Sequence, residues 1–248
     1  MREYLNSLTK NAKIIRLLLL ILLEAFAIFS VIYFSLTGDA SQIFLAVANI
    51  FISLLPFLFE IWFKTKLSLP LHLFFTVYIA GLLLGHSYHF YDYLPFWDSM
   101  LHAFGGFTIA LIGSYLLYFL NKKQEVSKLV SVIFAISLAL ALSVLWEFVE
   151  YSCDHLIGSD MQKDTVITTI RSYFLGSKIG EIGTIENIST VTVNGETLPV
   201  AGYLDIGLID TLTDLLMALI GSVVVSIYLL LISDKYPLIQ PQQKKESV

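Results

Sequence analysis

Six long apolar segments constrain the fold of this chain more than any other feature. Each has roughly the 17 to 25 residues that an α-helix needs to cross the hydrocarbon core of a bilayer. They are Ile14–Leu36, Phe44–Phe63, Leu69–Gly85, Met100–Leu120, Leu129–Tyr151 and Ile209–Ser233. Because backbone in lipid must satisfy its own hydrogen bonds, such segments are expected to be helical. The sequence therefore predicts an all-α integral membrane protein with six transmembrane helices, a single multi-pass domain over residues 1–248.

The composition agrees with this class and excludes several others. Only 14% of the 248 residues are charged, against about 25% in ordinary soluble domains. The net charge of -5 and the lack of a basic patch give no indication of a nucleic-acid partner. Cys153 is the one cysteine, which excludes an internal disulfide and a cysteine-rich metal motif. The lipid bilayer is the partner that the sequence implies, and the oligomeric state stays open.

The basic residues predict how the chain is oriented. With the N-terminus in the cytoplasm, twelve of the 15 Lys and Arg residues fall on the inner side of the membrane. The other three, Lys163, Arg171 and Lys178, share one long outer loop. This distribution follows the positive-inside rule, so both termini are predicted to be cytoplasmic. Residues 236–248 are expected to form a disordered cytoplasmic tail.

The long outer loop, residues 152–208, is the one sizeable piece outside the membrane. Asn194-Gly195 lies within it, between residues of alternating character. Asn-Gly in such a setting is a strong hairpin signal, because both turn residues adopt positive φ. We therefore expect a small β-hairpin in an extracytoplasmic insert.

Pairs of ionisable residues mark the outer ends of the last three spans. The pairs are Asp98 with His102, Glu147 with Glu150, and Asp210 with Asp214. Spacings of three or four put both members of a pair on one helix face. A ring of carboxylates in a low dielectric is costly unless protons or a cation neutralise it. Carboxylates with one imidazole suit a divalent metal, here Zn, Mn, Fe or Mg, and helix bundles build metal sites in this way.

The simpler interpretation is that acids near helix ends are solvated by headgroups. Asp98 and Asp210 also lie near helix N-termini, where a carboxylate complements the macrodipole. Glu147 and Glu150 lie near a C-terminus, where that explanation does not hold. Three pairs at one membrane face therefore favour a shared site. Neighbouring residues that could join it are Asp154, Asp160, Asp164, Asp205 and Thr211.

Other polar residues within the spans have ordinary interpretations. Glu24 lies inside the first span with no evident partner, and snorkelling would explain it. Glu60 is expected to pair with Lys64 at i+4 near the inner end of the second span. Pro56 is expected to kink the same span.

Four stretches resemble a known family: WDSMLHAFGGF, LWEFVEY, SDMQKDT and GYLDIGLIDTLTDLLMALIG. They are similar to the YjdF-like bacterial inner-membrane proteins, a family of unknown function, over roughly spans three to six. The family pattern of Asp-x-x-x-His, Trp-Glu-x-x-Glu and Asp-Thr-x-x-Asp falls on eight positions here. These are Asp98, His102, Trp146, Glu147, Glu150, Asp210, Thr211 and Asp214. The resemblance implies a bacterial plasma-membrane protein and supports the position of the site, but it supplies no reaction.

Two functions compete for this site. The first is a metal-dependent hydrolase or transferase acting on a lipid or envelope substrate. Its predicted ligands are Asp98, His102, Glu150, Asp210 and Asp214. Glu147 would be the general base, and Thr211 would orient a ligand. No cofactor other than the metal is predicted.

The alternative is a cation transporter or channel, for a metal or for protons, that uses the same acidic vestibule. The inner halves of the last three spans hold few polar residues, which disfavours a path through the membrane. A non-catalytic partner protein that binds through its outer loop is a third interpretation.

Overall fold

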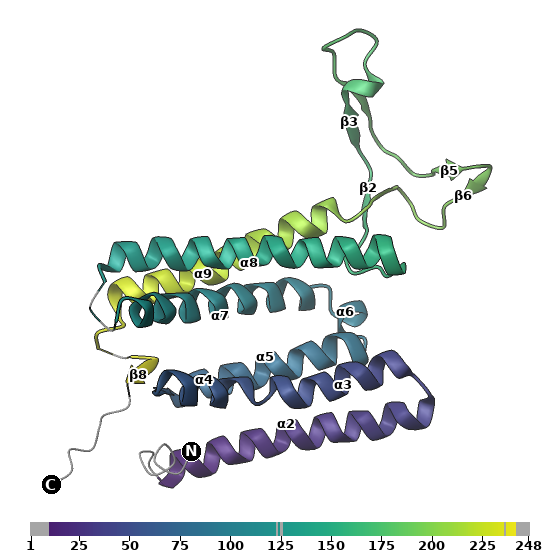
Figure 1. Ribbon diagram of the computed structural model, residues 1–248. Helices are drawn as coiled ribbons and strands as arrows, with labels where there is room; N and C mark the ends of the chain where they lie inside the picture. The colour runs from purple at the N-terminus through teal and green to yellow at the C-terminus, as the bar shows by residue number, and fades with distance from the viewer. Residues whose placement is uncertain (1–9, 123, 125, 236, 242–248) are drawn as a thin grey trace, which may run out of the picture. The chain divides into compact units, whose positions relative to one another are not determined.

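The computed structural model describes residues 10–122, 124, 126–235 and 237–241, and it is mostly helical (Figure 1). Its helices are α2 (Lys10–Thr37), α3 (Ala40–Ile52), α4 (Leu55–Phe63), α5 (Leu69–Ser87), α6 (Phe90–Tyr93), α7 (Trp97–Leu120), α8 (Lys128–Ile157) and α9 (Leu208–Leu231). Within the described residues, six helical segments are long and apolar enough to cross a membrane. The predicted six-span, mainly helical fold is confirmed.

The second span is interrupted near its middle. It consists of α3 and α4, with a turn at Ser53 and Leu54 between them. Pro56 lies in the first turn of α4, where its missing N–H would have had no helical partner. The proline therefore begins a new helix rather than bending a continuous one.

The chain divides into two compact units. The first comprises Met1–Leu140 together with Met217–Val248, and the second is Ala141–Leu216. Both boundaries fall inside unbroken helices, α8 and α9. Each unit is described separately below.

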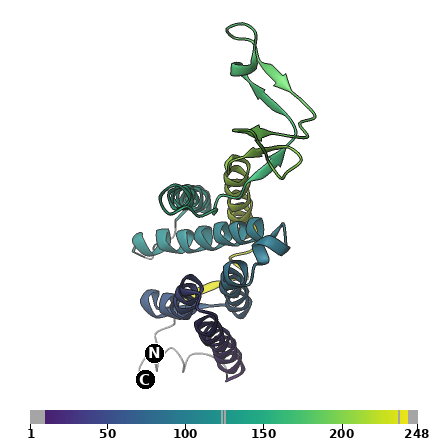
Figure 2. The same cartoon turned by 90° about the vertical axis from the view of Figure 1, so that its right-hand side faces the viewer.

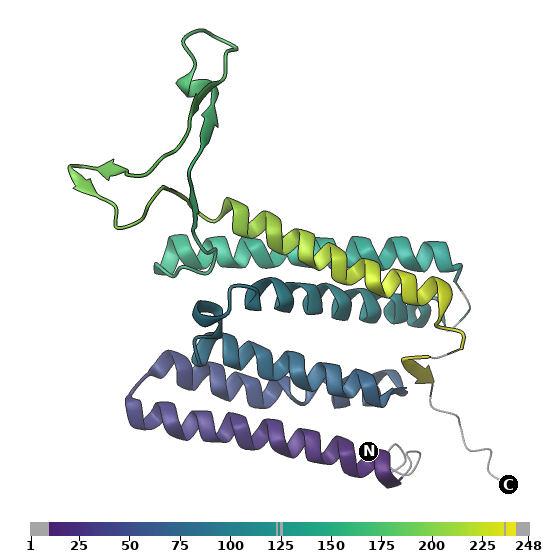
Figure 3. The ribbon, with the colours of Figure 1, turned by 180° about the vertical axis from the view of Figure 1, so that it is seen from behind.

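In the first unit, long helices pack side by side around an apolar core. Figures 1 and 3 show α2, α3, α5 and α7 running alongside one another. The core contains buried side chains from five helices and β1: Leu23, Leu67, Leu71, Phe75, Ile79, Ala110, Leu111, Ala135, Ala139 and Val225. Many large apolar side chains elsewhere on these helices are exposed, as expected where the surrounding medium is lipid.

Small residues bring α7 and α9 together within this unit. A Cβ on Gly106 would lie 2.1 Å from the backbone oxygen of Ala218. A Cβ on Gly221 would lie 2.0 Å from the backbone oxygen of Ala103. Each glycine therefore permits a backbone approach that a side chain would block, as in other membrane helix pairs.

A short strand pair closes one end of the first unit. β1 (Thr65–Leu67) pairs antiparallel with β8 (Ile239–Pro241), with Lys66 opposite Gln240. This strand forms within the segment predicted to be disordered; residue 236 and residues 242–248 lie outside the described residues.

Glu60 forms a buried network and does not serve as a surface partner of Lys64. Its side chain is fully buried, and Arg16 Nη1 lies 3.1 Å from Glu60 Oε1. The backbone N–H of Leu67 donates to the same oxygen at 2.6 Å, and Arg16 Nη2 donates to the carbonyl of Leu67. His72 Nε2 lies 3.4 Å from Glu60 Oε1. The expected i+4 pair was wrong, because a buried guanidinium from another helix satisfies the carboxylate.

The second unit contains three antiparallel strand pairs (Figure 2). They are β2 (Thr165–Ile167) with β7 (Tyr203–Asp205), β3 (Ile170–Ser172) with β4 (Gly183–Ile185), and β5 (Thr192–Val193) with β6 (Glu196–Thr197). A 3₁₀ turn, η1 (Tyr173–Leu175), follows β3. Asn194 and Gly195 connect β5 to β6 with φ of 52° and 90°, so the predicted hairpin is confirmed.

The helix that enters this loop is longer than expected. α8 continues to Ile157, six residues into the predicted insert. Gly158 follows with φ of 69°, the left-handed conformation in which a glycine commonly ends a helix. The loop between α8 and α9 thus begins at Gly158.

Candidate functional site

One narrow face of α8 is buried in its second half. Ser143, Glu147 and Glu150 are at most 8% exposed. Trp146 and Phe148, between them in sequence, are 46% and 61% exposed. The buried positions are four and three residues apart, so they form a stripe one residue wide on a 3.6-residue helix. Both glutamates therefore point inward from a helix whose other faces suit lipid.

Three buried carboxylates meet in the second unit. Glu147, Glu150 and Asp214 are 4%, 6% and 1% exposed. Each offers a carboxylate oxygen, and the three oxygens lie within 4.8 Å of one another. Three ionised carboxylates at this separation in a low dielectric repel one another strongly. Either protons neutralise some of them, or a bound cation balances their charge. We call Glu147, Glu150 and Asp214 the acidic cluster.

Trp146 holds one member of the acidic cluster in place. Its indole Nε1 donates a hydrogen bond of 2.7 Å to Oε1 of Glu150, one turn further along α8. A donor on one carboxylate oxygen fixes the orientation of the other, which is how outer partners position metal ligands.

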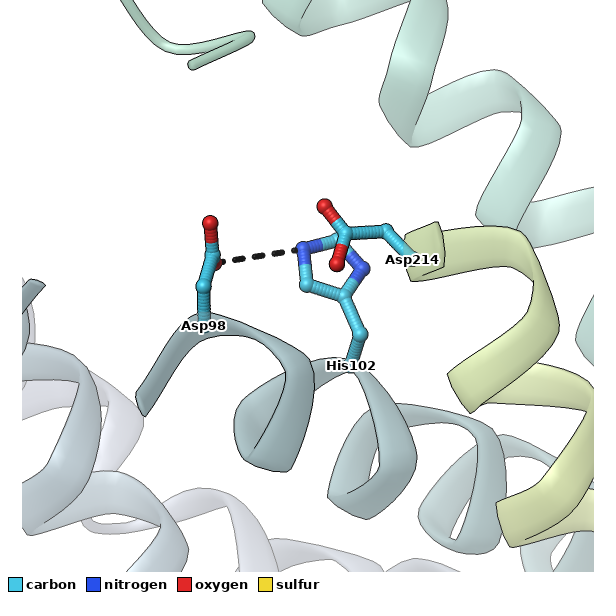
Figure 4. A group of neighbouring side chains, drawn as sticks. All are labelled: Asp98, His102 and Asp214. Atoms are coloured by element: carbon cyan, nitrogen blue, oxygen red, sulfur yellow. Dashed lines mark ion pairs between the residues drawn. The ribbon is translucent and has the colours of Figure 1, made fainter. Parts of the chain in front are cut away.

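In the first unit, the first predicted pair is also formed. Asp98 and His102 lie in the first two turns of α7, and His102 Nε2 is 3.6 Å from Asp98 Oδ1 (Figure 4). Their side chains are 16% and 12% exposed. The i+4 spacing stacks them on one face, as expected from the sequence. Figure 4 also draws Asp214, which belongs to the second unit.

Several other predicted residues anchor the loop that follows α8. Both oxygens of Asp154 accept backbone N–H groups, from Met161 at 2.7 Å and Gln162 at 2.8 Å. Gln162 Nε2 in turn donates to Thr211 Oγ1 at 2.6 Å. Asp154 is thus engaged by the loop backbone, and Thr211 contacts a glutamine that the sequence analysis did not identify.

The beginning of α9 is held in a similar way. Asp210 Oδ2 accepts the backbone N–H of Lys163 at 2.9 Å. Asp205 Oδ2 accepts the N–H of Ile209 at 2.7 Å, in the manner of a helix cap. The contacts of Gln162 with Thr211 and of Lys163 with Asp210 secure residues 159–163, which we call the anchored segment, against the start of α9.

Asp160 and Asp164 lie outside the acidic cluster, and both are exposed. Local desolvation, together with the carboxylates of Asp164 and Asp154, raises the pKa of Asp160 above its ordinary value of 3.8. The side chain of Lys163 acts in the opposite direction. A carboxyl group in this setting is easier to protonate, or to neutralise with a cation, than an isolated one.

Comparison with known proteins identifies the family. A family model described as "Predicted membrane protein (DUF2238)" matches residues 15–235. The chain belongs to this family. The match includes all six candidate spans nearly in full, so this DUF2238 protein is a multi-pass membrane protein. No curated protein matches the chain, and no solved structure does.

Proposed function

We propose that this DUF2238 protein is a metal-dependent membrane enzyme, a hydrolase or transferase that acts on a lipid or envelope substrate. The observation that carries the proposal is the acidic cluster, with three carboxylate oxygens within 4.8 Å. Oxygen donors of this kind suit Mg or Mn, and an added imidazole would suit Zn or Fe. A resident divalent cation would neutralise three acids on buried helix faces, where uncompensated charge is costly.

Within the cluster we assign different roles to the two glutamates. Glu150 and Asp214 are ligands, and the hydrogen bond from Trp146 presents Glu150 in a fixed orientation. Glu147, one turn before Glu150, is the general base that accepts a proton from the attacking group. A bound divalent cation would supply Lewis acidity at the scissile group.

We also propose Asp98 and His102 as metal ligands. The support is the pair that they form on one face of α7, with His102 Nε2 3.6 Å from Asp98 Oδ1. A carboxylate and an imidazole one turn apart are a common ligand pair for divalent metals.

Asp210 lies one turn before Asp214 on the same face of α9. Its contact with Lys163 leads us to place it at the rim, where it adds negative charge and retains the anchored segment.

The location of the site is also a proposal. The distribution of Lys and Arg supports cytoplasmic termini, which would put the acidic cluster at the outer face. The resemblance to YjdF-like proteins supports a bacterial plasma membrane.

A cation transporter or channel is the second candidate, because α9 carries a polar stripe. Ser222 and Ser226 follow Asp214 on this helix and are 0% and 5% exposed. However, the hydroxyl of Ser222 donates to Leu219 O, and that of Ser226 donates to Ser222 O. Both hydroxyls bind their own helix, and the neighbouring core is apolar. These contacts favour the enzyme.

An experiment in proteoliposomes distinguishes the enzyme from the transporter. Purified protein is reconstituted with bacterial envelope lipids and Mg²⁺, Mn²⁺ or Zn²⁺, and lipid products are followed by mass spectrometry together with metal uptake. The enzyme predicts new lipid products that are lost in Glu147→Gln while bound metal is retained. Metal uptake into vesicles without lipid turnover, abolished by Glu147→Gln, would replace the enzyme with the transporter.

A further inference from the structure

The first unit contains an apolar cavity of about 300 Å³ between α4, α5, α7 and β8. Its walls include Phe59, Leu71, Phe75, Leu111 and Ile112. Among the lining residues, only Trp62, Tyr78 and Thr108 have a polar side-chain atom. Apolar walls of this kind do not bind water molecules, so such a cavity stays empty of water. In a bilayer, its natural occupant is a hydrocarbon chain.

The length of the cavity matches one lipid chain. Its α5 lining extends from Leu71 to Leu82, which at 1.5 Å per residue is about 16 Å along the helix. That is about half of the ~30 Å hydrocarbon core, the depth of one leaflet. The cavity therefore accommodates a single extended chain.

One end of the cavity is built rigidly. Leu67 and Ile239, opposite each other in the β1–β8 pair, both line it. Glu60 and Arg16 bind the backbone N–H and carbonyl of Leu67 through the buried network described above. Because a buried ion pair fixes the backbone at this end, the cavity is expected to exist before any ligand binds.

The side of the cavity is accessible from the membrane. Leu55 and Trp62 line it and are 52% and 71% exposed. Both belong to the second candidate span, so their exposed surfaces are expected to face lipid. A chain could enter laterally between them without crossing water.

Hydroxyl groups lie in the part of the cavity wall farther from Leu67 and Ile239, with Leu82 beyond them on α5. Thr108 Oγ1 is buried and has no hydrogen-bond partner among the described residues. The hydroxyl of Tyr78 would lie 3.1 Å from a Cβ on Gly105, so it abuts α7. Gly105 is one turn after His102 on this helix. Thr108 is therefore the α7 lining residue nearest in sequence to His102 and Asp98.

We propose that this cavity binds one acyl chain of a glycerophospholipid, with the ester carbonyl at Thr108 and Tyr78. The headgroup phosphate would then lie near His102, where a divalent cation could neutralise it. This inference rests on the proposed function for the fate of the headgroup, and it names phospholipids as the substrate class. The chain site itself depends on α4, α5 and α7 alone.

The test is photocrosslinking in nanodiscs with the full-length protein. The probe is a phosphatidylethanolamine with a diazirine in one acyl chain, and labelled peptides are mapped by mass spectrometry. Labelling is expected on the cavity walls, around Phe59, Phe75 and Leu111. Ile112→Trp should lower it by about tenfold, because the indole fills the space of the chain. Val77→Trp is the matched control, since Val77 is 56% exposed on α5 and does not line the cavity; it should leave labelling unchanged.

A second variant covers the case in which Ile112→Trp does not fold. Thr108→Val keeps the cavity but removes a hydroxyl, and it should lower labelling by about fivefold at limiting probe, as for one lost hydrogen bond. Labelling spread evenly over lipid-facing positions such as Val77 would overturn the proposal. So would equal labelling by a diazirine fatty acid or an isoprenoid phosphate.

The same experiment in chelator, and in Glu150→Gln, separates the two proposals. Labelling of the cavity walls should persist in both conditions. Wall labelling in a protein that binds no metal would remove the proposed function and leave the chain site intact. A metal-binding protein without wall labelling would remove only the phospholipid assignment.

Discussion

Trp146 Nε1 donates a hydrogen bond of 2.7 Å to Glu150 Oε1, so an indole that is nearly half exposed orients a buried carboxylate. The pair lies within one helix, at i and i+4, and therefore forms without help from the rest of the fold. It connects the lipid-facing surface of α8 to the acidic cluster.

Trp146→Phe should weaken divalent-metal binding by about tenfold or more, as for the loss of other groups that orient a metal ligand. The ring still covers the same surface, so the melting temperature in detergent should change little. Isothermal titration with Mn²⁺ measures the effect. Phe148→Leu, at a 61% exposed position on the same helix, is the control and should bind like the wild type. Equal affinity in Trp146→Phe would show that the indole does not position a ligand.

Neighbouring glycines on α7 should respond differently to the same change. Gly106→Ala should lower the free energy of unfolding by about 1–3 kcal/mol, because its Cβ would meet the backbone of Ala218. Gly105→Ala should have a small effect, since a Cβ there approaches only the hydroxyl of Tyr78, a movable side-chain atom. Thermal unfolding in detergent compares the two. Equal destabilisation would contradict the close α7–α9 packing.

The buried network predicts a large loss of stability when one partner is removed. Arg16→Ala should lower the free energy of unfolding by about 3–5 kcal/mol, because Glu60 would keep a buried charge without its guanidinium. Lys64→Ala, which removes the cation expected from the sequence, should stay within about 0.5 kcal/mol. If Lys64→Ala destabilised the protein more than Arg16→Ala, the i+4 pair between Glu60 and Lys64 would be the correct one.

Much of the fold could be predicted because it depends on local sequence. Segment length identified the six spans, and Asn194-Gly195 identified the hairpin through its backbone preference. The network of Arg16, Glu60 and His72 could not be predicted in this way, since Arg16 and Glu60 are 44 residues apart. His72 was the available signal, an ionisable residue four positions into an apolar segment.

The candidate site could likewise be predicted from the sequence only where it depends on local spacing. Helical spacing correctly placed Glu147 with Glu150, and Asp98 with His102, on shared faces. It could not show that Asp154 and Asp210 bind the backbone of the anchored segment, because loop geometry decides which carboxylates have N–H partners. Two acids at equivalent spacing can therefore hold a loop or face the core, and only tertiary structure distinguishes them.

The anchored segment should tighten when Asp160 is neutralised. Its pKa is raised in the fold, so the unfolded chain loses the proton first, and stability falls as the pH rises from 3.8 through the folded value. Asp160→Asn removes this loss of stability. The variant should become more stable than the wild type as the pH rises from 3.8 to the folded pKa, and the difference in stability should remain constant at higher pH. Lys163→Gln should act in the opposite direction, because it removes a nearby positive charge.

Hydrogen exchange at Met161 and Gln162, corrected for intrinsic pH dependence, reports on the segment. Slower exchange than in the wild type is expected for Asp160→Asn above pH 3.8, and faster exchange for Lys163→Gln. The same exchange rates in all three proteins would mean that the charges around Asp160 do not affect the stability of the anchored segment.

The most direct measurement is the metal content of the purified full-length protein, prepared without chelator and analysed by elemental mass spectrometry. The account predicts about one divalent ion per chain, lost in both Glu150→Ala and Asp214→Ala and retained in the surface variant Glu196→Ala. A wild-type protein that carries no divalent metal, and acquires none on titration with Mg²⁺, Mn²⁺, Fe²⁺ or Zn²⁺, would contradict it.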